Sequence, residues 1–193
     1  MFTGIVETVG VVKEIIPDKS NSHFRIESPI SHELKIDQSV SHNGVCLTVT
    51  KVVGASHWVT AIQETLLKSN LINLQVSSII NLERCMKADG RFDGHIVQGH
   101  VDQTAICEKI SDSDGSYVFR FSFEPSSHSL LVEKGSIGVD GVSLTCFNVE
   151  RDSFEVAIIP YTWQHTAFHK LDVGSAVNLE FDIIGKYVRA IMK

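Results

Sequence analysis

Short stretches in which apolar and polar residues alternate run along most of the chain. In the first half, alternating or β-branched residues fill the ranges 5–16, 23–28, 45–53, 58–63 and 79–86, and their second-half partners repeat this layout. A period of two residues places successive side chains on opposite faces of a strand. Helical patterns are few and short, near residues 64–71, 127–133 and 164–169. The pattern predicts an all-β protein built from short antiparallel strands.

The second half of the chain is a copy of the first. Asn43-Gly44-Val45-Cys46-Leu47-Thr48 returns 97 residues later as Asp140-Gly141-Val142-Ser143-Leu144-Thr145, with four of the six positions identical. The same offset aligns residues 76–83 with 173–180, and an offset of 95 aligns residues 4–6 with 99–101. A period this long indicates two duplicated domains rather than a solenoid. We therefore expect each half to be a small antiparallel barrel or sandwich of about six strands.

Polar turn residues suggest where one domain ends and the next begins. Residues 88–91 read Ala-Asp-Gly-Arg, so we place the first domain at residues 1–90 and the second at residues 91–183. Residues 184–193 form the third part, in which Ile184, Tyr187, Val188 and Ile191 recur at helical spacing. This spacing predicts a short C-terminal helix whose apolar stripe requires a partner, either another subunit or the helix's own barrel.

Composition narrows the class of protein. With 193 residues, 43% of them hydrophobic and 21% charged, the chain has enough apolar side chains for two modest cores. A net charge of -6 and a lack of Lys/Arg clusters argue against a nucleic-acid partner. The chain shows neither a signal-peptide pattern nor an apolar run near the ~20 residues of a membrane helix. We therefore expect no membrane association and a cytoplasmic location.

Cysteine and histidine spacing gives no metal motif. The four cysteines, Cys46, Cys85, Cys107 and Cys146, are too far apart for a Cys-x-x-Cys pair, so we expect free thiols. His95 and His100 would fall on opposite faces of a strand, and His165 and His169 would share a helix face without a third ligand nearby. No metal site is expected.

The repeated motif carries the most chemical information. Asn-Gly and Asp-Gly are hairpin-turn pairs, and a duplicated barrel would repeat its turns whatever its function. After the turn, however, Cys46 and Thr48 share one strand face, as Ser143 and Thr145 do in the second copy. Paired polar groups of this kind are suited to hydrogen bonding with a flat heterocycle. Ligand binding and a purely structural repeat both remain open on this pattern.

Longer motifs resemble a known family. Residues 1–7, 43–49, 64–66, 76–84, 94–102 and 140–145 are similar to the alpha-chain riboflavin synthase family over nearly the whole chain. The resemblance implies two tandem six-stranded Greek-key barrels, a homotrimer, and a transferase that dismutates two molecules of 6,7-dimethyl-8-ribityllumazine. The products would be riboflavin and 5-amino-6-(ribitylamino)uracil. No cofactor is implied, because the substrate's own ring system stabilises the carbanion formed at its 7-methyl group.

The resemblance also implies which residues act. Substrate contacts of the first barrel would be Gly4, Ile5, Val6, Cys46, Leu47, Thr48, Thr60, Ala61, Ile62, Gln63, Glu64 and Thr65. Those of the second would be Gly99, His100, Val101, Lys134, Ser143, Leu144, Thr145, Ala157, Ile158, Ile159, Pro160, Tyr161 and Thr162. Residues implicated in the chemistry would be Phe2, Ser39, Cys46, His100, Asp140, Ser143 and Thr145. Tyr161 departs from the family pattern, in which many members carry Glu after the proline.

Differences between the two copies suggest how identical substrates could be treated differently. When the two halves are aligned, Asn43 corresponds to Asp140, Cys46 to Ser143 and Ile5 to His100. Histidine has an ordinary pKa near neutrality, so His100 is either a proton shuttle or a hydrogen-bonding strand residue. Two other classes of protein remain: a non-catalytic lumazine- or flavin-binding antenna protein of the same fold, and a structural protein built on paired barrels.

Overall fold

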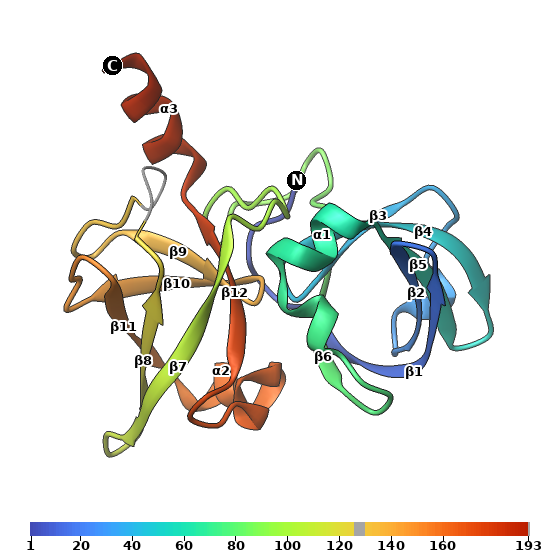
Figure 1. Cartoon of the computed structure of the whole chain (residues 1–193), viewed down its shortest axis with the longest axis horizontal. Coiled ribbons are helices and arrows are strands. Elements are labelled where there is room, and N and C mark those ends of the chain that lie inside the picture. The colour runs from blue at the N-terminus through green and yellow to red at the C-terminus, as the bar shows by residue number, and fades with distance from the viewer. Residues whose placement is uncertain (126–129, 193) are drawn as a thin grey trace.

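The computed structural model describes residues 1–125 and 130–192, and within them the chain forms two closed six-stranded barrels that lie side by side (Figure 1). The strands of the first barrel are β1 Thr8–Asp18, β2 Asn21–Glu27, β3 Ser39–His42, β4 Val45–Val53, β5 Ser56–Ala61 and β6 Ile79–Arg84. Those of the second are β7 Gln103–Asp112, β8 Tyr117–Phe123, β9 Ser136–Val139, β10 Val142–Phe147, β11 Ser153–Ile158 and β12 Ala176–Phe181. The all-β fold and its internal duplication are confirmed.

Strand order follows the Greek-key rule in both barrels. The first closes as β1-β2-β5-β4-β3-β6, and the second closes in the same order when β7 is matched to β1. The consecutive strands β3, β4 and β5 lie next to one another, and β2 returns to pair with β5, so four strands make one Greek key. Closure pairs both edges of each sheet and leaves no free strand edge for aggregation.

The repeated motif forms the turn that the sequence predicts. Asn43 and Gly44 join β3 to β4 with φ angles of 47° and 79°, and Asp140 and Gly141 join β9 to β10 with φ angles of 45° and 78°. Positive φ at both central residues defines a type I′ hairpin. The two turns meet, because a Cβ on Gly44 would lie 2.7 Å from the backbone nitrogen of Gly141. Glycine is therefore required both by backbone conformation and by close approach.

Each strand turns its apolar face inward. On β4, Val45, Leu47 and Val49 are buried, while the side chains between them are at least partly exposed. Full burial of such a side chain contributes about 1.5–3 kcal/mol, so this alternation fixes the register of the strand. The second core is richer in aromatic rings and contains Phe119, Phe121, Phe123, Phe154, Phe168 and Phe181.

A series of hydrogen-bonded polar side chains lies beside the apolar core of the first barrel. His42 Nδ1 donates to the carbonyl of Val40 at 3.0 Å, so its Nε2 carries a lone pair, and His57 Nε2 donates to it at 2.9 Å. His57 Nδ1 then accepts from the Ser31 hydroxyl at 2.8 Å, and Ser31 lies 2.8 Å from Ser28. Burial lowers the pKa of His42 to about 3 and that of His57 to about 4, so both rings are neutral near pH 7.

Among the described residues, three short α-helices accompany the strands: α1 Gln63–Lys68, α2 Pro160–His165 and α3 Ile183–Ile191. The predicted helices near residues 64–71 and 164–169 correspond to α1, to the end of α2 and to the 3-10 turns Asn70–Asn73 and Ala167–Lys170. The helix predicted at residues 127–133 is wrong over 130–133, where a turn leads into β9, and its first residues lie outside the described range. The C-terminal helix α3 is confirmed and extends away from the second barrel (Figure 1), while Lys193 lies outside the described residues. In the described part of the chain no helix is long and apolar enough to cross a membrane.

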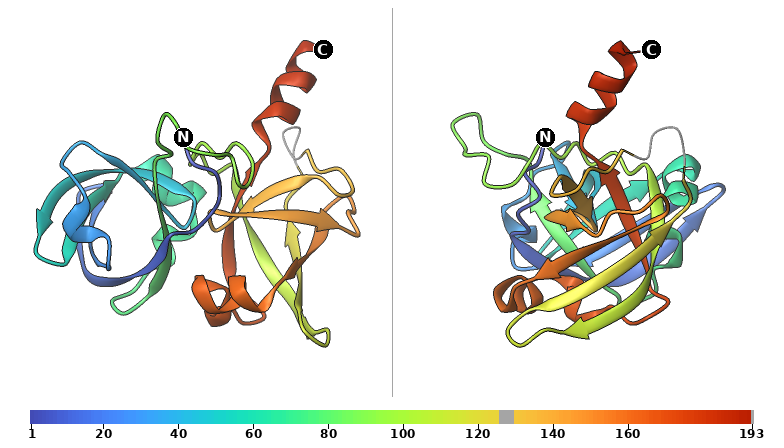
Figure 2. Two further views of the ribbon diagram at one scale, coloured as in Figure 1. Left: turned by 180° about the vertical axis from the view of Figure 1, so that it is seen from behind. Right: turned by 90° about the vertical axis from the view of Figure 1, so that its left-hand side faces the viewer.

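Two irregular segments cross between the barrels. Residues 1–7 precede β1 and residues 94–102 precede β7, and Phe2 of the first pairs with Val97 of the second in an isolated antiparallel bridge. Figure 2 shows the N-terminal segment running beside the second barrel before it enters the first. The predicted join at residues 87–92 is irregular, and the domain boundary at residue 90 remains a prediction.

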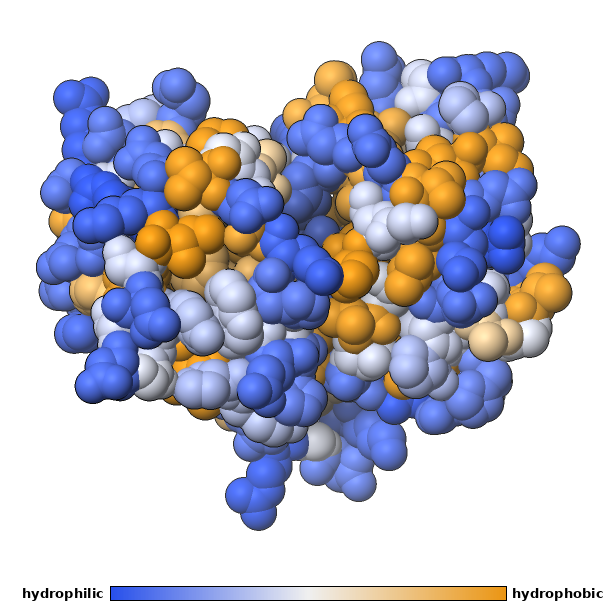
Figure 3. Space-filling view, turned by 90° about the horizontal axis from the view of Figure 1, so that it is seen from below, coloured by the Kyte–Doolittle hydropathy of each residue, from blue (hydrophilic) through white to orange (hydrophobic). Residues whose placement is uncertain are grey.

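Both barrels expose large apolar side chains. They include Leu67 and Ile72 in the first half, and Ile159 and Val173 in the second. Seen from below, apolar patches lie on both sides of the seam between the barrels (Figure 3). Exposed patches on a folded surface are typical of binding or interaction sites.

Candidate ligand-binding site

A glycine segment from one half covers the motif strand of the other half. Cys46 N donates to the carbonyl of Gly99 at 2.9 Å, and Ser143 N donates to that of Gly4 at 2.7 Å. Gly4 and Gly99 have φ angles of 77° and 82°. A Cβ on Gly99 would lie 2.5 Å from the Cβ of Cys46, and one on Gly4 would lie 2.6 Å from that of Ser143. Only glycine allows these two backbones to approach so closely.

This crossing changes the predicted grouping of site residues. We expected residues 4–6 to act with Cys46 and residues 99–101 to act with Ser143. The grouping was wrong, since Gly4 contacts Ser143 and Gly99 contacts Cys46. The following residues agree: Val6 packs against the second core, and Val101 packs against the first. Each candidate pocket is thus built from both halves of the chain.

Two buried carboxylates hold the crossing segments in place. Glu83 accepts hydrogen bonds from the backbone of Thr3 at 2.7 Å and of Gly4 at 3.0 Å. Glu180 accepts from the backbone of Gln98, Gly99 and His100 at 2.6, 2.9 and 3.0 Å. Burial raises the pKa of both carboxyl groups, while these backbone donors act in the opposite direction. Neither residue was predicted for the site, although both are retained in the repeated segment, which was a usable signal.

The first pocket has a volume of about 270 Å³ and gathers residues that lie far apart in the sequence. It brings together six predicted contacts, Cys46, Glu64, Thr65, Gly99, His100 and Val101, with Val45, Lys68 and Ser69. The Lys68 ammonium lies 3.1 Å from the Glu64 carboxylate, one helical turn away. Sequence reasoning did not identify Lys68, although its spacing of four residues from Glu64 on a predicted helix was a signal.

Cys46 lies in this pocket as a neutral thiol. Burial raises the pKa of Cys46, and a hydrogen bond with Ser39 opposes the shift. Because the thiolate is the nucleophilic form of cysteine, a neutral Cys46 thiol is suited to hydrogen bonding and contact rather than to nucleophilic attack. Ser39 lies on β3 opposite Thr48 of β4. This places two of the predicted chemical residues, Cys46 and Ser39, in contact.

The repeat identifies the equivalent region of the other barrel, which we take as the second candidate pocket. The offsets of the repeat relate the lining of the first pocket to Gly4, Ile5, Val6, Val142, Ser143, Tyr161, Thr162, His165 and Thr166. Where the first pocket has the pair of Glu64 and Lys68, the second has Tyr161 and His165, whose rings stack 4.0 Å apart. Ile5 and Tyr161 are exposed, so this region is open to solvent. The same fold therefore carries an ion pair at one pocket and an aromatic pair at the other.

Other predicted contacts divide into core-facing and exposed side chains. Leu47, Ala61 and Ile158 belong to the two cores, so only their backbone groups can reach a ligand. Leu144 is partly buried against the second core. Thr60 lies 2.8 Å from the Nδ1 atom of His23. The exposed members of the set are Thr48, Ile62, Gln63, Thr145, Ala157, Ile159 and Pro160.

Three predicted residues lie away from the first pocket. Phe2 is fully buried, and its backbone pairs with Val97 through bonds of 2.7 and 3.1 Å, so it fixes the crossing segments. The Lys134 ammonium lies over the ring of Phe147, 5.1 Å from its centroid, at the turn before β9. Asp140 lies in the contact between the barrels. The catalytic roles of Phe2 and Asp140, and the substrate contact of Lys134, remain predictions.

Asparagine side chains form the contact between the two barrels with approximate twofold symmetry. Asn81 Nδ2 donates to the carbonyl of Asp140 at 2.9 Å, and Asn178 Nδ2 donates to that of Asn43 at 2.8 Å. The Asp140 carboxylate accepts from Asn178 N at 2.7 Å and from Asn70 Nδ2 at 2.9 Å. Burial raises the pKa of Asp140 to about 7. The Asp140 carboxyl group is therefore protonated below about pH 7 and ionised above it. The equivalent residue of the first barrel, Asn43, does not titrate.

Paired barrels with related pockets define a protein of tandem ligand-binding domains. The model of the lumazine binding domain matches residues 3–85 and again residues 98–182. Riboflavin synthase of Actinobacillus pleuropneumoniae is 38% identical over 193 residues, which span this whole chain and 90% of the relative. Riboflavin synthase of Bacillus subtilis is 40% identical over 189 residues, 97% of this chain and 88% of the relative. The chain belongs to the riboflavin synthase family.

A solved structure shows the same fold at lower identity. LumP complexed with 6,7-dimethyl-8-(1'-D-ribityl) lumazine superposes with a TM-score of 0.85 and 22% identity. The match covers 94% of this chain and 99% of LumP. At this identity the likeness concerns the fold alone.

Proposed function

We propose that this protein is a riboflavin synthase. It takes two molecules of 6,7-dimethyl-8-ribityllumazine, moves a four-carbon unit from one to the other, and releases riboflavin and 5-amino-6-(ribitylamino)uracil. The observation that carries the proposal is similarity of 38–40% to riboflavin synthases along the entire chain. A pair of related pockets supports it, because the reaction consumes two copies of one substrate.

The two pockets offer the same substrate different surroundings. Cys46, His100 and the Glu64–Lys68 pair surround one molecule. Ser143 and the stacked rings of Tyr161 and His165 surround the other. This chemical difference assigns unequal roles to two identical molecules, which a dismutation requires.

The contribution of the protein is to position the substrates and to transfer protons. Holding two reactants in contact replaces a bimolecular encounter, which lowers the barrier by up to several kcal/mol. His100 is exposed and lines the Cys46 pocket, so its ring contacts both a bound ligand and solvent. An imidazole in that place is suited to carrying a proton between the substrate and water. The substrate's own ring takes up the negative charge left on its 7-methyl carbon.

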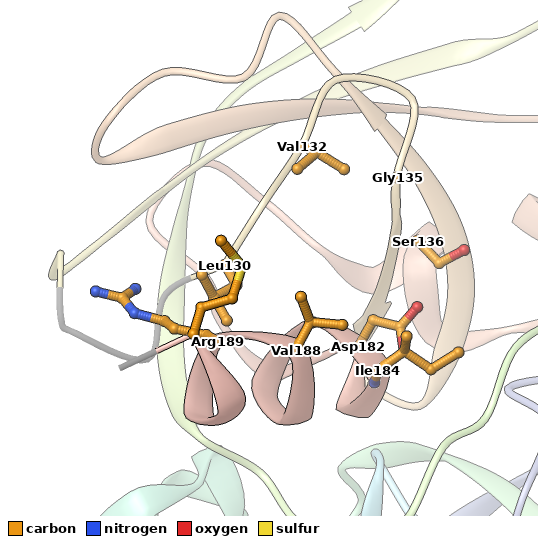
Figure 4. A pocket seen from close by; sticks show the side chains of 10 residues that line it. Leu130, Val132, Gly135, Ser136, Asp182, Ile184, Val188 and Arg189 are labelled. Atoms are coloured by element: carbon orange, nitrogen blue, oxygen red, sulfur yellow. Dashed lines mark hydrogen bonds between the residues drawn. The ribbon is translucent and has the colours of Figure 1, made fainter.

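Residues of α3 support a homotrimer in which the first barrel of one subunit meets the second barrel of its neighbour. Ile184, Tyr187, Val188 and Ile191 are 57%, 66%, 51% and 82% exposed, so the apolar stripe is only partly covered by its own barrel. Between α3 and residues 130–136 lies a groove of about 500 Å³, with Leu130, Val132 and Val188 directed into it (Figure 4). An exposed apolar face of this kind is typical of a surface that a partner subunit buries.

We also expect the enzyme to act in the cytoplasm.

A lumazine-binding protein without turnover is the second candidate, and the LumP fold is the observation that favours it. Incubating the purified chain with the lumazine in a chelator, without nucleotide, separates the two. The enzyme forms riboflavin over many turnovers. Binding at one or two equivalents without riboflavin formation would replace the proposal with the second candidate.

A further inference from the structure

His95 stands directly behind Ser143. Its Nδ1 atom lies 2.7 Å from Ser143 Oγ, although 48 residues separate them in sequence. Its Nε2 atom is buried and has no hydrogen-bond partner among the described residues. The mechanism above gives His95 no role.

The backbone around His95 is built to bring the two side chains together. His95 N donates to the carbonyl of Thr3 at 3.1 Å. A Cβ on the preceding Gly94 would lie 2.1 Å from that carbonyl and 3.0 Å from Ser143 Oγ. A side chain at Gly94 would therefore displace either the Thr3 carbonyl or the side chain of Ser143. On the opposite side Gly4 contacts Ser143, so two glycines and one histidine enclose this hydroxyl.

The surroundings of His95 favour one tautomer. Burial lowers the pKa of His95 and outweighs the opposing charge of Asp182, so the neutral ring is favoured at pH 7. A neutral imidazole has one N–H and one lone pair. Among buried backbone groups, unpaired N–H donors are rarer than under-satisfied carbonyl acceptors, and we extend this preference to the imidazole ring. The proton therefore belongs on Nδ1, where it donates to Ser143 Oγ, and the lone pair belongs on the unpartnered Nε2.

The first pocket has no such arrangement. Cys46, which is equivalent to Ser143, has a hydrogen bond with Ser39 instead of a histidine. A thiol is also a weaker donor than a hydroxyl. The two pockets thus differ behind the motif strand as well as at their rims.

We propose that His95 is a positioning residue that fixes the Ser143 hydroxyl as a hydrogen-bond donor to the ligand of the second pocket. With Nδ1–H occupying a lone pair of Oγ, the hydroxyl proton points toward the open side of the half-buried serine. The group it binds is an acceptor of a flat heterocycle, a carbonyl oxygen or an unprotonated ring nitrogen. Such a bond strengthens when the ring carries negative charge, so the second pocket favours the anionic form of its ligand. The identity of the ligand rests on the proposed function, and the role of His95 toward Ser143 does not.

Nitrogen-15 NMR of the histidine side chains in the unliganded protein tests the tautomer without any ligand or turnover. We expect His95 to show a protonated Nδ1 and an unprotonated Nε2 at pH 7, and His95→Asn to identify its signals by their loss. A protonated Nε2 would overturn the proposal, because Ser143 would then donate to His95 and could not be held as a donor to the ligand. This result stands whether or not the protein turns over lumazine.

Riboflavin titration, followed by flavin fluorescence, tests the consequence for binding. His95→Leu removes the donor and should weaken one of the two binding sites about tenfold, near the upper end of the net effect of losing one hydrogen bond. His95→Asn places an amide nitrogen where Nδ1 stands and should stay within about threefold of the parent protein. His32→Leu is the matched control, since His32 is exposed on the first barrel, away from both pockets. Affinities of both sites unchanged from the parent protein in His95→Leu, with native circular dichroism, would overturn the proposal.

Discussion

His100 and Cys46 come from different halves of the chain and line the same pocket. The backbone of Gly99, just before His100, accepts the hydrogen bond of Cys46 N at 2.9 Å. Gly4 and Ser143 repeat this relationship in the other barrel. Neither barrel therefore has a complete pocket without the crossing segment from the other half.

Substitutions in the two pockets should affect turnover more than binding. We expect His100→Ala to lower the turnover number by about a hundredfold, the lower limit for a general acid or base, with a smaller change in lumazine affinity. Ser143→Ala should act in the same direction. Cys46→Ser should stay within about threefold, because the second barrel already carries serine at this position. Unchanged turnover in His100→Ala, measured by steady-state kinetics, would return His100 to a purely structural role.

Acid should destabilise the first barrel through its histidine pair. The folded pKa values of His42 and His57, about 3 and about 4, lie below the ordinary 6.5 of an unfolded histidine. Their contribution to stability is present above pH 6.5 and decreases as the pH falls toward 4, at roughly 1.4 kcal/mol per pH unit for each ring.

The second barrel shows which apolar residues fill the positions of the two histidines. Val139 and Phe154 stand at the equivalent positions. We therefore expect His42→Val with His57→Phe to flatten the pH dependence of urea unfolding between pH 7 and pH 5, and His32→Gln on the surface to leave it unchanged. The same slope in the double variant would show that other groups cause the acid sensitivity.

Asp140 should give the opposite slope. Its folded pKa of about 7 lies above its ordinary value of 3.8, so the folded protein binds the extra proton between these values. Stability is then highest below pH 4, decreases as the pH rises to 7, and is constant above it. Asp140→Asn, which copies Asn43, should stabilise the protein at pH 8 by about 1–4 kcal/mol and leave it unchanged near pH 4. Equal stability of the two proteins at pH 8, by urea unfolding, would mean that the carboxyl group is not buried in solution.

Association should depend on the apolar face of α3. Ile191→Asp places a charge on that face and should yield smaller species that bind lumazine but turn it over poorly, whereas Ala190→Asp, one residue off the stripe, should stay associated. Deleting the residues after Gly185 should act like Ile191→Asp, although it also removes the Lys186 ion pair with Asp102, 2.6 Å long. Sedimentation velocity beside the activity assay measures both. A monomer with full specific activity at high dilution would show that subunits do not share a pocket.

The duplication, the hairpin turns and the polar strand face were predictable because the sequence shows each directly, as a repeated motif, as turn-forming residue pairs and as a two-residue period. The crossing of residues 1–7 and 94–102 was not, since a two-residue period determines which face a side chain occupies but not which barrel it covers. The four-residue strands β3 and β9 are too short to show alternation. His95 was interpreted as a strand residue, yet its segment is irregular, and its approach to Ser143 depends on a tertiary contact that spacing does not reveal.

The ratio of products tests the central claim, a dismutation in two unequal pockets, most directly. Chromatography of a reaction run in chelator, with the lumazine as the sole added substrate, measures what is consumed and formed. We predict that two lumazines disappear for each riboflavin, with one 5-amino-6-(ribitylamino)uracil formed alongside it. Riboflavin formed in equal amount to the lumazine consumed, or no riboflavin despite saturating binding, would contradict the account.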